Sequence, residues 1–440
     1  MKRFWTFPVS RLWQARTTAG TICQAQDSMT TLPPEVIIMI FQYLSPGSSQ
    51  LDECTSQQGN LASALLVCRA WYHSGVAMLY SRPIVYLFAV DLLLGAVRRR
   101  GDLGGYVQAI VVMIPPLDPR RSKTSPRYVR DFFTILQTVP SIQSLALRPL
   151  PNRHDPDPPY FPREAFLGMT FQPHQLQNLR RFVFDGLALS PDSLFQSPHT
   201  AVVLPVLEEL SVIHVALANS FDWPTCPSLI RLQIKSCRFI DRNIVFRLPE
   251  SALKQIDMDE SWSDEDDADI SGSLYPFAPT LEVLRLDTVL FHREVHLVDY
   301  SRLASLRHLA LFLNELSFPA PPLPPTVARI PTLESLFLTC FWALDTSFSP
   351  WTVVDSLNSL MRSGERVFEA LRVLVVQAES HVWREGPEGE EGSTQLEGIC
   401  DERRIDLVLR ECSFIEHRRG LPNVHPSYRV LGLEGILADC

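Results

Sequence analysis

A hydrophobic motif repeated nine times is the feature that most constrains how this 440-residue chain can fold. Each copy has apolar residues at its first, fourth and sixth positions, in the pattern L-x-x-L-x-L. The copies begin at Ile142, Leu179, Leu207, Leu229, Leu253, Leu281, Leu306, Leu333 and Leu371. Successive copies start 37, 28, 22, 24, 28, 25, 27 and 38 residues apart, so most intervals lie near one period. Such a period is typical of stacked units that each contribute a short strand and bury their apolar faces only against their neighbours.

The copy at Leu229 continues to Cys237 and Phe239, which completes the longer pattern L-x-x-L-x-L-x-x-C-x-L. On these motifs, residues 140–410 resemble leucine-rich-repeat proteins. The resemblance implies an irregular solenoid with a parallel β-sheet on its concave face. Further elements are predicted at its two ends: a helix at 91–100, a strand at 106–112, a helix at 396–404 and a strand at 405–409.

Residues between and just after the motif leucines face the concave groove in such a fold, so they are the candidate contacts for a target protein. The central copies place charged residues there, and the later copies place apolar ones. The candidate target-binding residues are Lys235, Asp259, Arg285, Asp287, Phe312, Phe337 and Val375. Exposed aromatic side chains on a rigid sheet are suitable protein-binding anchors, so we expect a target to dock along the C-terminal half. The alternative is that a loop or the tail Leu421–Cys440 covers these side chains.

Residues 31–80 predict three short amphipathic helices. Proline at positions 33 and 34 is tolerated because the N–H groups of a first helical turn have no intrahelical partner. One face of the first helix is apolar, with Val36, Ile37, Ile40, Phe41 and Leu44. The second and third helices carry Leu61, Leu65, Cys68, Tyr72, Val76, Leu79 and Tyr80. Three helices in about fifty residues form only a small core, so the surplus apolar surface indicates a partner protein.

The string L-P-P-E-V-I-x-x-I-F-x-Y-L, from Leu32, and the string L-L-V-C-R-x-W-Y, from Leu65, carry a second resemblance. Over residues 31–83 the chain resembles an F-box, most closely the fungal kind. The resemblance implies docking on a Skp-type adaptor of a cullin-based ubiquitin ligase, through Leu32, Pro33, Ile37, Ile40, Phe41, Leu44, Leu65, Val67, Cys68 and Trp71. The polar stretch Pro46–Asn60 is longer than the family usually carries, but lengthening a loop costs little free energy. The alternative interpretation is a three-helix cap that seals the larger domain.

These features predict a mixed α/β chain in which an N-terminal three-helix F-box precedes an irregular leucine-rich-repeat solenoid. The predicted divisions are a disordered arm at 1–28, the F-box at 29–83, and the solenoid at 84–440 with proline-rich and acidic loop insertions. The first 26 residues contain no acidic residue and several basic ones. A mitochondrial transit peptide is therefore an alternative to a disordered arm or to an extension upstream of Met29.

Composition narrows the class of function. A net charge of −9 argues against a nucleic-acid footprint, and no apolar run approaches the roughly 20 residues of a membrane helix. Nine cysteines without a C-x-x-C pair and the lack of an N-x-[ST] sequon favour an intracellular protein, cytoplasmic or nuclear or both. The segment Asp257–Asp269 fails as an EF-hand because its sixth position is Trp262, so we expect a solvated acidic insertion there.

No H-E-x-x-H, G-x-S-x-G or P-loop pattern occurs, and we expect no cofactor and no catalysis. The sequence therefore predicts a non-catalytic substrate-recognition subunit of a Skp–cullin–F-box ubiquitin ligase. Two alternatives remain at this stage. One is a repeat scaffold that binds a protein without ubiquitin transfer, and the other is an enzyme of an unrecognised fold, for which no motif speaks.

Overall fold

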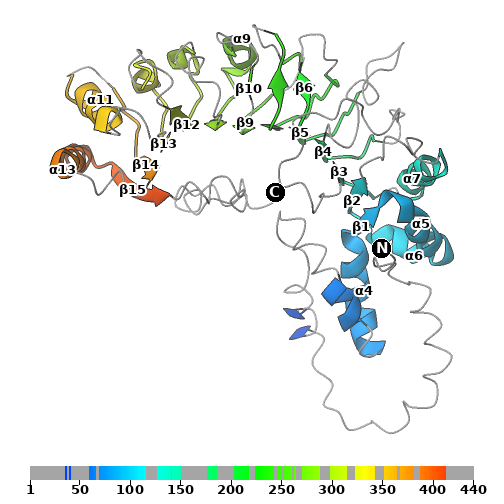
Figure 1. Ribbon diagram of the computed structural model, residues 1–440. Coiled ribbons are helices and arrows are strands. Elements are labelled where there is room, and N and C mark those ends of the chain that lie inside the picture. The colour runs from blue at the N-terminus through cyan, green and yellow to red at the C-terminus, as the bar shows by residue number, and fades with distance from the viewer. Residues whose placement is uncertain are drawn as a thin grey trace, which may run out of the picture. The chain divides into compact units, whose positions relative to one another are not determined.

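The computed structural model describes residues 35–36, 39–40, 59–65, 69–114, 126–139, 141–149, 176–185, 203–217, 223–241, 246–248, 252–259, 262–263, 270–287, 298–314, 323–341, 351–363, 367–379 and 387–412. The chain divides into two compact units (Figure 1). Unit 1 comprises residues 1–115 and 123–145, and unit 2 comprises residues 116–122 and 146–440. The predicted arm at 1–28 lies outside the described residues. Residues 59–64 are helical, so the predicted loop Pro46–Asn60 is wrong for its last two residues, and the rest of it lies outside the described residues.

Unit 1 is built mainly of helices around two short parallel strands. Its elements are α4 (Arg69–Ser81), β1 (Ile84–Tyr86), η2 (Leu87–Ala89), α5 (Val90–Arg99), α6 (Gly101–Tyr106), β2 (Ala109–Ile114) and α7 (Pro126–Thr138). Helix α5 buries one apolar face, with Val90, Leu93, Leu94 and Val97, which confirms the helix predicted there. The strand predicted from Tyr106 begins three residues later, because residues up to Tyr106 belong to α6.

The motif copies form the strands of one open parallel sheet. These strands are β3 (Ser144–Pro149), β4 (Arg181–Asp185), β5 (Glu209–Ile213), β7 (Arg231–Lys235), β9 (Gln255–Asp259), β11 (Val283–Asp287), β12 (His308–Asn314), β13 (Ser335–Phe341) and β14 (Val373–Glu379). In every copy the strand starts two residues after the first apolar residue. With β1, β2 and the last strand β15 (Asp406–Cys412), the order across the twelve-stranded sheet is β1-β2-β3-β4-β5-β7-β9-β11-β12-β13-β14-β15.

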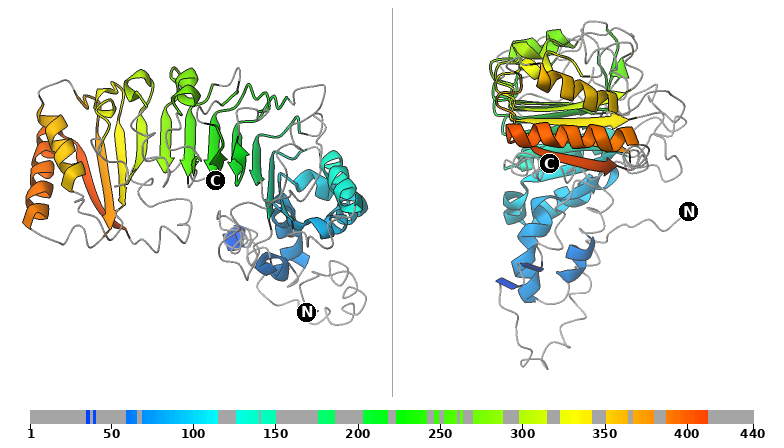
Figure 2. Two further views of the ribbon diagram at one scale, coloured as in Figure 1. Left: turned by 45° about the horizontal axis from the view of Figure 1, so that its top comes forward. Right: turned by 90° about the vertical axis from the view of Figure 1, so that its left-hand side faces the viewer.

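The remaining elements of unit 2 connect these strands. Three two-residue strands, β6 (Ala216–Leu217), β8 (Arg238–Phe239) and β10 (Trp262–Ser263), form a second small parallel sheet in the order β10-β8-β6. The described helices are α9 (Ser271–Leu274), η4 (Tyr275–Phe277), η5 (Tyr300–Arg302), η7 (Val327–Arg329), α11 (Trp351–Arg362) and α13 (Pro387–Arg403). Figure 2 shows α11 and α13 lying side by side. Arg403 joins them by donating hydrogen bonds to the carbonyl oxygens of Met361 and Val367.

The core of the sheet lies on the side of the motif leucines. The side chains at the first, fourth and sixth motif positions are between 0% and 5% exposed in all nine copies. A repeated backbone bond fixes the register of the strands. The carbonyl of Arg180 accepts hydrogen bonds from the N–H groups of both Glu208 and Glu209, at 2.7 and 2.9 Å. The same double acceptance recurs at the carbonyls of Glu208, Ile230, Lys254, Glu282, Arg307 and Glu334. Each copy from Leu179 onward is thereby aligned with the next.

Candidate functional site

Unit 1 contains a small apolar cluster in the region of the predicted adaptor-binding helices. Leu61 and Leu65 are buried at its centre, and partly buried Ala64, Trp71, Tyr72, Met78 and Leu79 pack around them. The structure therefore brings together two of the predicted adaptor-binding residues, Leu65 and Trp71. Leu65 is only 4% exposed, which gives it a packing role within the cluster. Trp71 is half-buried.

The other predicted adaptor-binding residues are only partly described. Residues 35–36 and 39–40 are helical, as the apolar periodicity predicts, and Ile40 is half-buried. Met39 beside it is 60% exposed, a large apolar side chain facing solvent. Outside the described residues lie Leu32, Pro33, Ile37, Phe41, Leu44, Val67 and Cys68.

Helix α4 is joined to the segment between α5 and α6 by a polar contact that the sequence does not predict. The guanidinium of Arg100 donates a hydrogen bond to the hydroxyl of Tyr72 at 2.6 Å and lies 5.8 Å from the centre of its ring. The same guanidinium pairs with Asp102 at 2.6 Å. The hydrogen bond between them raises the pKa of Arg100 and lowers the pKa of the Asp102 carboxyl. Tyr72 and Arg100 are 28 residues apart, so no local pattern could have predicted this contact.

Unit 2 presents a second candidate surface on the sheet face opposite the leucines, which we call the ladder face. Because side chains alternate between the faces of a strand, the residues between the leucines align there in rows. The first row is Arg181, Glu209, Arg231, Gln255, Val283, His308, Ser335, Val373 and Asp406. The second is Val183, Ser211, Gln233, Asp257, Arg285, Ala310, Phe337, Val375 and Val408. The third has two runs, one of Asp185, Ile213, Lys235, Asp259 and Asp287, the other of Phe312, Thr339, Gln377 and Arg410.

All seven predicted target-binding residues lie in the second and third rows. Arg285, Phe337 and Val375 belong to the second row. The third row holds Lys235, Asp259, Asp287 and Phe312. The prediction that these residues share one face of one sheet is therefore confirmed. Their role in binding a target stays a prediction.

The part of the ladder face on β4–β11 is charged but internally paired. Glu209 lies 3.3 Å from Arg181 and 3.1 Å from Arg231. Lys235 lies 3.1 Å from Asp259 on the next strand, and Arg285 lies 3.7 Å from Asp257. Positive and negative charges thus compensate each other across neighbouring strands, as cross-strand pairing favours. The expected solvated acidic insertion is wrong for its first residues, since Asp257 is 7% exposed within β9 and the segment continues into β10.

In the three rows of the ladder face, the residues on β12–β14 are uncharged apart from the titratable His308. The expectation that its apolar side chains are exposed is wrong: Phe312 is 4% exposed, Phe337 5% and Val375 0%. Neighbouring strands stand only about 4.8 Å apart, so side chains of one row shield each other, as Phe337 is flanked by Ala310 and Val375. Gln377 in the same region is 3% exposed, and its side-chain oxygen has no hydrogen-bond partner among the residues that the structure describes.

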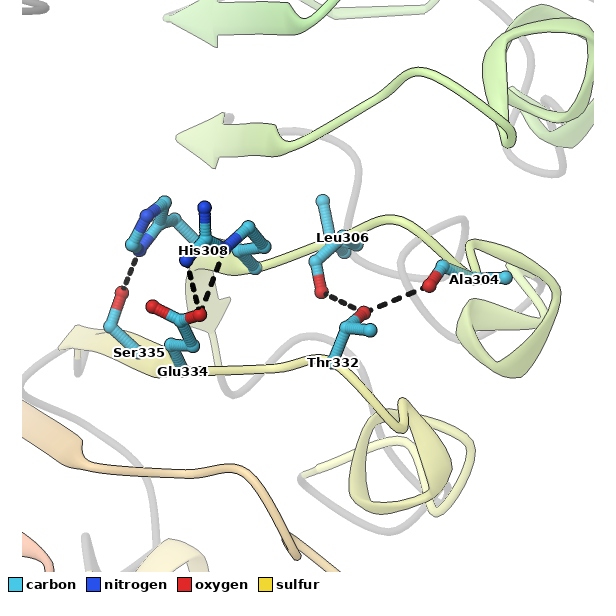
Figure 3. Close-up of polar contacts among 7 residues, drawn as sticks. Ala304, Leu306, His308, Thr332, Glu334 and Ser335 are labelled. Carbon is cyan, nitrogen blue, oxygen red and sulfur yellow. Dashed lines mark hydrogen bonds and ion pairs between the residues drawn. The ribbon is translucent and has the colours of Figure 1, made fainter.

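The first row carries a polar contact between β12 and β13 (Figure 3). His308 Nδ1 lies 2.7 Å from the Ser335 hydroxyl, and burial lowers the pKa of the imidazole. Directly before the two strands, Arg307 donates a hydrogen bond to Glu334 at 2.8 Å. The hydroxyl of Thr332 donates to the carbonyl oxygens of Ala304 and Leu306. These contacts join two strands and show no acid, base and nucleophile in a catalytic arrangement.

The described residues were also searched for a metal site and for a membrane-spanning helix. Among the described residues, no group of three or more His, Cys, Asp or Glu side chains is placed to hold a metal ion. The described helices also include none with the length and apolarity needed to cross a membrane.

Comparison with known proteins identifies one domain. The sequence model of a protein family described as F-box-like matches residues 29–83. The chain therefore carries an F-box-like domain at the position of the apolar cluster and of helix α4. F-box domains generally bind Skp-type adaptors, and F-box proteins are generally non-catalytic adaptors of Skp–cullin–F-box ligases. No curated protein matches the chain.

Proposed function

We propose that this protein is the substrate-recognition subunit of a Skp–cullin–F-box ubiquitin ligase. In this proposal the F-box-like domain binds a Skp-type adaptor and, through it, a cullin. The sheet of unit 2 is a leucine-rich-repeat solenoid whose ladder face binds the target protein. The alternative is a repeat scaffold that binds a protein without ubiquitin transfer. The ubiquitin-ligase function would place the protein inside the cell, in the cytoplasm, the nucleus or both.

The match of the F-box-like family to residues 29–83 carries the proposal. All residues of the apolar cluster around Leu61 and Leu65 lie within the matched stretch. The half-buried Trp71 and the exposed Met39 leave apolar surface for a partner. A three-helix domain of this size has little core of its own, so docking on an adaptor would bury surface that the isolated domain leaves in water.

The repeated strand geometry of unit 2 supports the second half of the proposal. Nine motif copies each place a strand at the same offset, and the same double backbone bond aligns the eight copies from Leu179 onward with one another. The result is a long, regular face on which side chains from distant parts of the chain align. Such a face is suited to holding a protein rather than to enclosing a small substrate. Bringing the target near a ubiquitin-loaded enzyme would accelerate transfer by proximity alone.

Co-purification with the adaptor tests this function. We expect the full chain to co-purify with a Skp-type adaptor and a cullin, and Leu32→Ala combined with Phe41→Ala to reduce adaptor binding about tenfold or more. A matched control removes apolar surface elsewhere: Val203→Ala with Ile240→Ala, two side chains 44% and 45% exposed in unit 2. We expect that control to bind like the wild type. Failure of the wild type to co-purify, or equal binding by both double variants, would favour the scaffold.

A further inference from the structure

Strand β15 is the last strand of the sheet and has one edge without a partner in the part of the chain that the structure describes. All seven residues, Asp406–Cys412, pair in parallel with β14 on one side. The strand order ends there, and no other described strand pairs with β15. Figure 1 shows β15 at the end of the row of strands, next to α13. Its second edge therefore presents backbone N–H and C=O groups that another strand could use.

The side chains of β15 are more accessible than those of its neighbour. Leu407, Val408 and Leu409 are half-buried, whereas their partners on β14, Leu374, Val375 and Val376, are 0%, 0% and 2% exposed. The strand contains no proline, and its centre is three consecutive apolar residues. An edge strand of this kind pairs readily with a second strand.

The hydrogen bonds to β14 determine which residues of β15 can bond outward. The N–H of Asp406 donates to the carbonyl of Arg372 at 2.7 Å, so the N–H and C=O of Asp406 are directed toward β14. These groups alternate in direction along a strand, so those of Leu407, Leu409 and Glu411 are directed toward the outer edge. An antiparallel partner bonds through such outward residues in closely spaced pairs.

One partner sequence fits this edge with opposite charges aligned, and it is the strand itself. In antiparallel pairing about a two-fold axis at Val408, Leu407 of one copy stands opposite Leu409 of the other, and both bond outward. Asp406 then stands opposite Arg410, at a non-hydrogen-bonded position where side chains lie closest. The symmetry gives two such opposite-charge pairs.

The neighbouring registers fit less well. An axis moved one residue toward the N-terminus, to Leu407, aligns Asp406 with Val408 and leaves Arg410 opposite a position outside the strand, so no opposite-charge pair forms. An axis moved to Leu409 aligns Val408 with Arg410 and leaves no opposite-charge pair. The sequence of β15 thus selects a single register, as specific strand pairing requires.

We propose that the outer edge of β15 is a dimerisation surface for a second copy of this chain. The contact is isologous, with the same strand contributed by each protomer. It extends the parallel sheet of each copy through one antiparallel step. The inference does not depend on adaptor binding, because every residue it uses lies in unit 2.

A charge-exchange experiment on the full chain tests the proposal. Sedimentation velocity over about 1–100 μM protein would show a monomer–dimer equilibrium of the wild type. Asp406→Arg and Arg410→Asp each align like charges, and we expect each to raise the dimer dissociation constant about tenfold or more. An equimolar mixture of the two variants aligns Arg with Asp at both positions. We expect heterodimers in that mixture and homodimers again in the double variant D406R/R410D.

The control is Glu402→Arg, the reverse of a charge on an exposed residue of α13 outside the edge strand, which should dimerise like the wild type. Circular dichroism of each variant establishes that it is folded. A wild type that stays monomeric throughout the concentration range overturns the proposal. So does a mixture that forms no heterodimer. A chain that is monomeric in full but dimeric when ended after Cys412 would also overturn it, because the C-terminal segment would then be the occupant of this edge.

Discussion

At the scale of single residues, His308 links stability to pH. Burial lowers the pKa of its imidazole, so the unfolded chain takes up a proton more readily than the folded chain. This residue therefore contributes stability above its unfolded pKa of about 6.5 that is lost as pH falls through the folded value. We expect the melting temperature of wild type to fall more between pH 7 and pH 5 than that of His308→Gln, measured by differential scanning calorimetry. His73→Gln, at an exposed position, should retain the wild-type pH dependence, and parallel curves for wild type and His308→Gln would contradict the assignment.

At the scale of one strand, the two faces of β12 and β13 should have separable roles. Phe312→Ala with Phe337→Ala removes side chains of the ladder face, and Leu311→Ala with Leu336→Ala removes their neighbours on the core face. All four residues are at most 5% exposed, so each substitution should cost about 2–5 kcal/mol of stability. The two double variants are compared at equal amounts of folded protein, and the ubiquitination of cellular proteins is quantified by mass spectrometry of ubiquitin remnants. We expect the ubiquitination of target proteins to fall only in the variant of the ladder face. Equal losses for both pairs would refute target binding by the ladder face.

The elements of the fold were largely predictable, and the side-chain environment was not. Each motif copy predicted a short strand because the alternation of apolar residues is local, and the structure shows that the strand starts two residues after the first apolar residue. The burial of Phe337 depends on Ala310 and Val375, which lie on strands contributed by other copies. The contact of Arg100 with Tyr72 joins residues 28 positions apart. Such environments arise only when the units are assembled, so the sequence predicted which residues share a face but not how exposed they are.

At the scale of the whole molecule, the two proposed functions lie in different units. The adaptor would bind residues 29–83 in unit 1, and the target would bind the ladder face in unit 2. Substitutions in one unit should therefore leave the other function intact. In cells, the Leu32→Ala with Phe41→Ala chain should still capture targets without ubiquitinating them, and the Phe312→Ala with Phe337→Ala chain should still bind the adaptor.

If the chain dimerises through β15, a variant that cannot bind the adaptor and a variant that cannot bind the target should complement each other. When the adaptor-binding variant and the ladder-face variant are expressed together, a heterodimer holds one intact F-box-like domain and one intact ladder face. We expect ubiquitination of the targets to recover in part, up to about half the wild-type level if the subunits assort at random. Adding Asp406→Arg to both chains should abolish that recovery, because like charges then meet at the edge strand. As a control, the same substitution in an otherwise wild-type chain should leave ubiquitination of the targets unchanged. Recovery that persists with Asp406→Arg in both chains would place the contact between subunits outside β15.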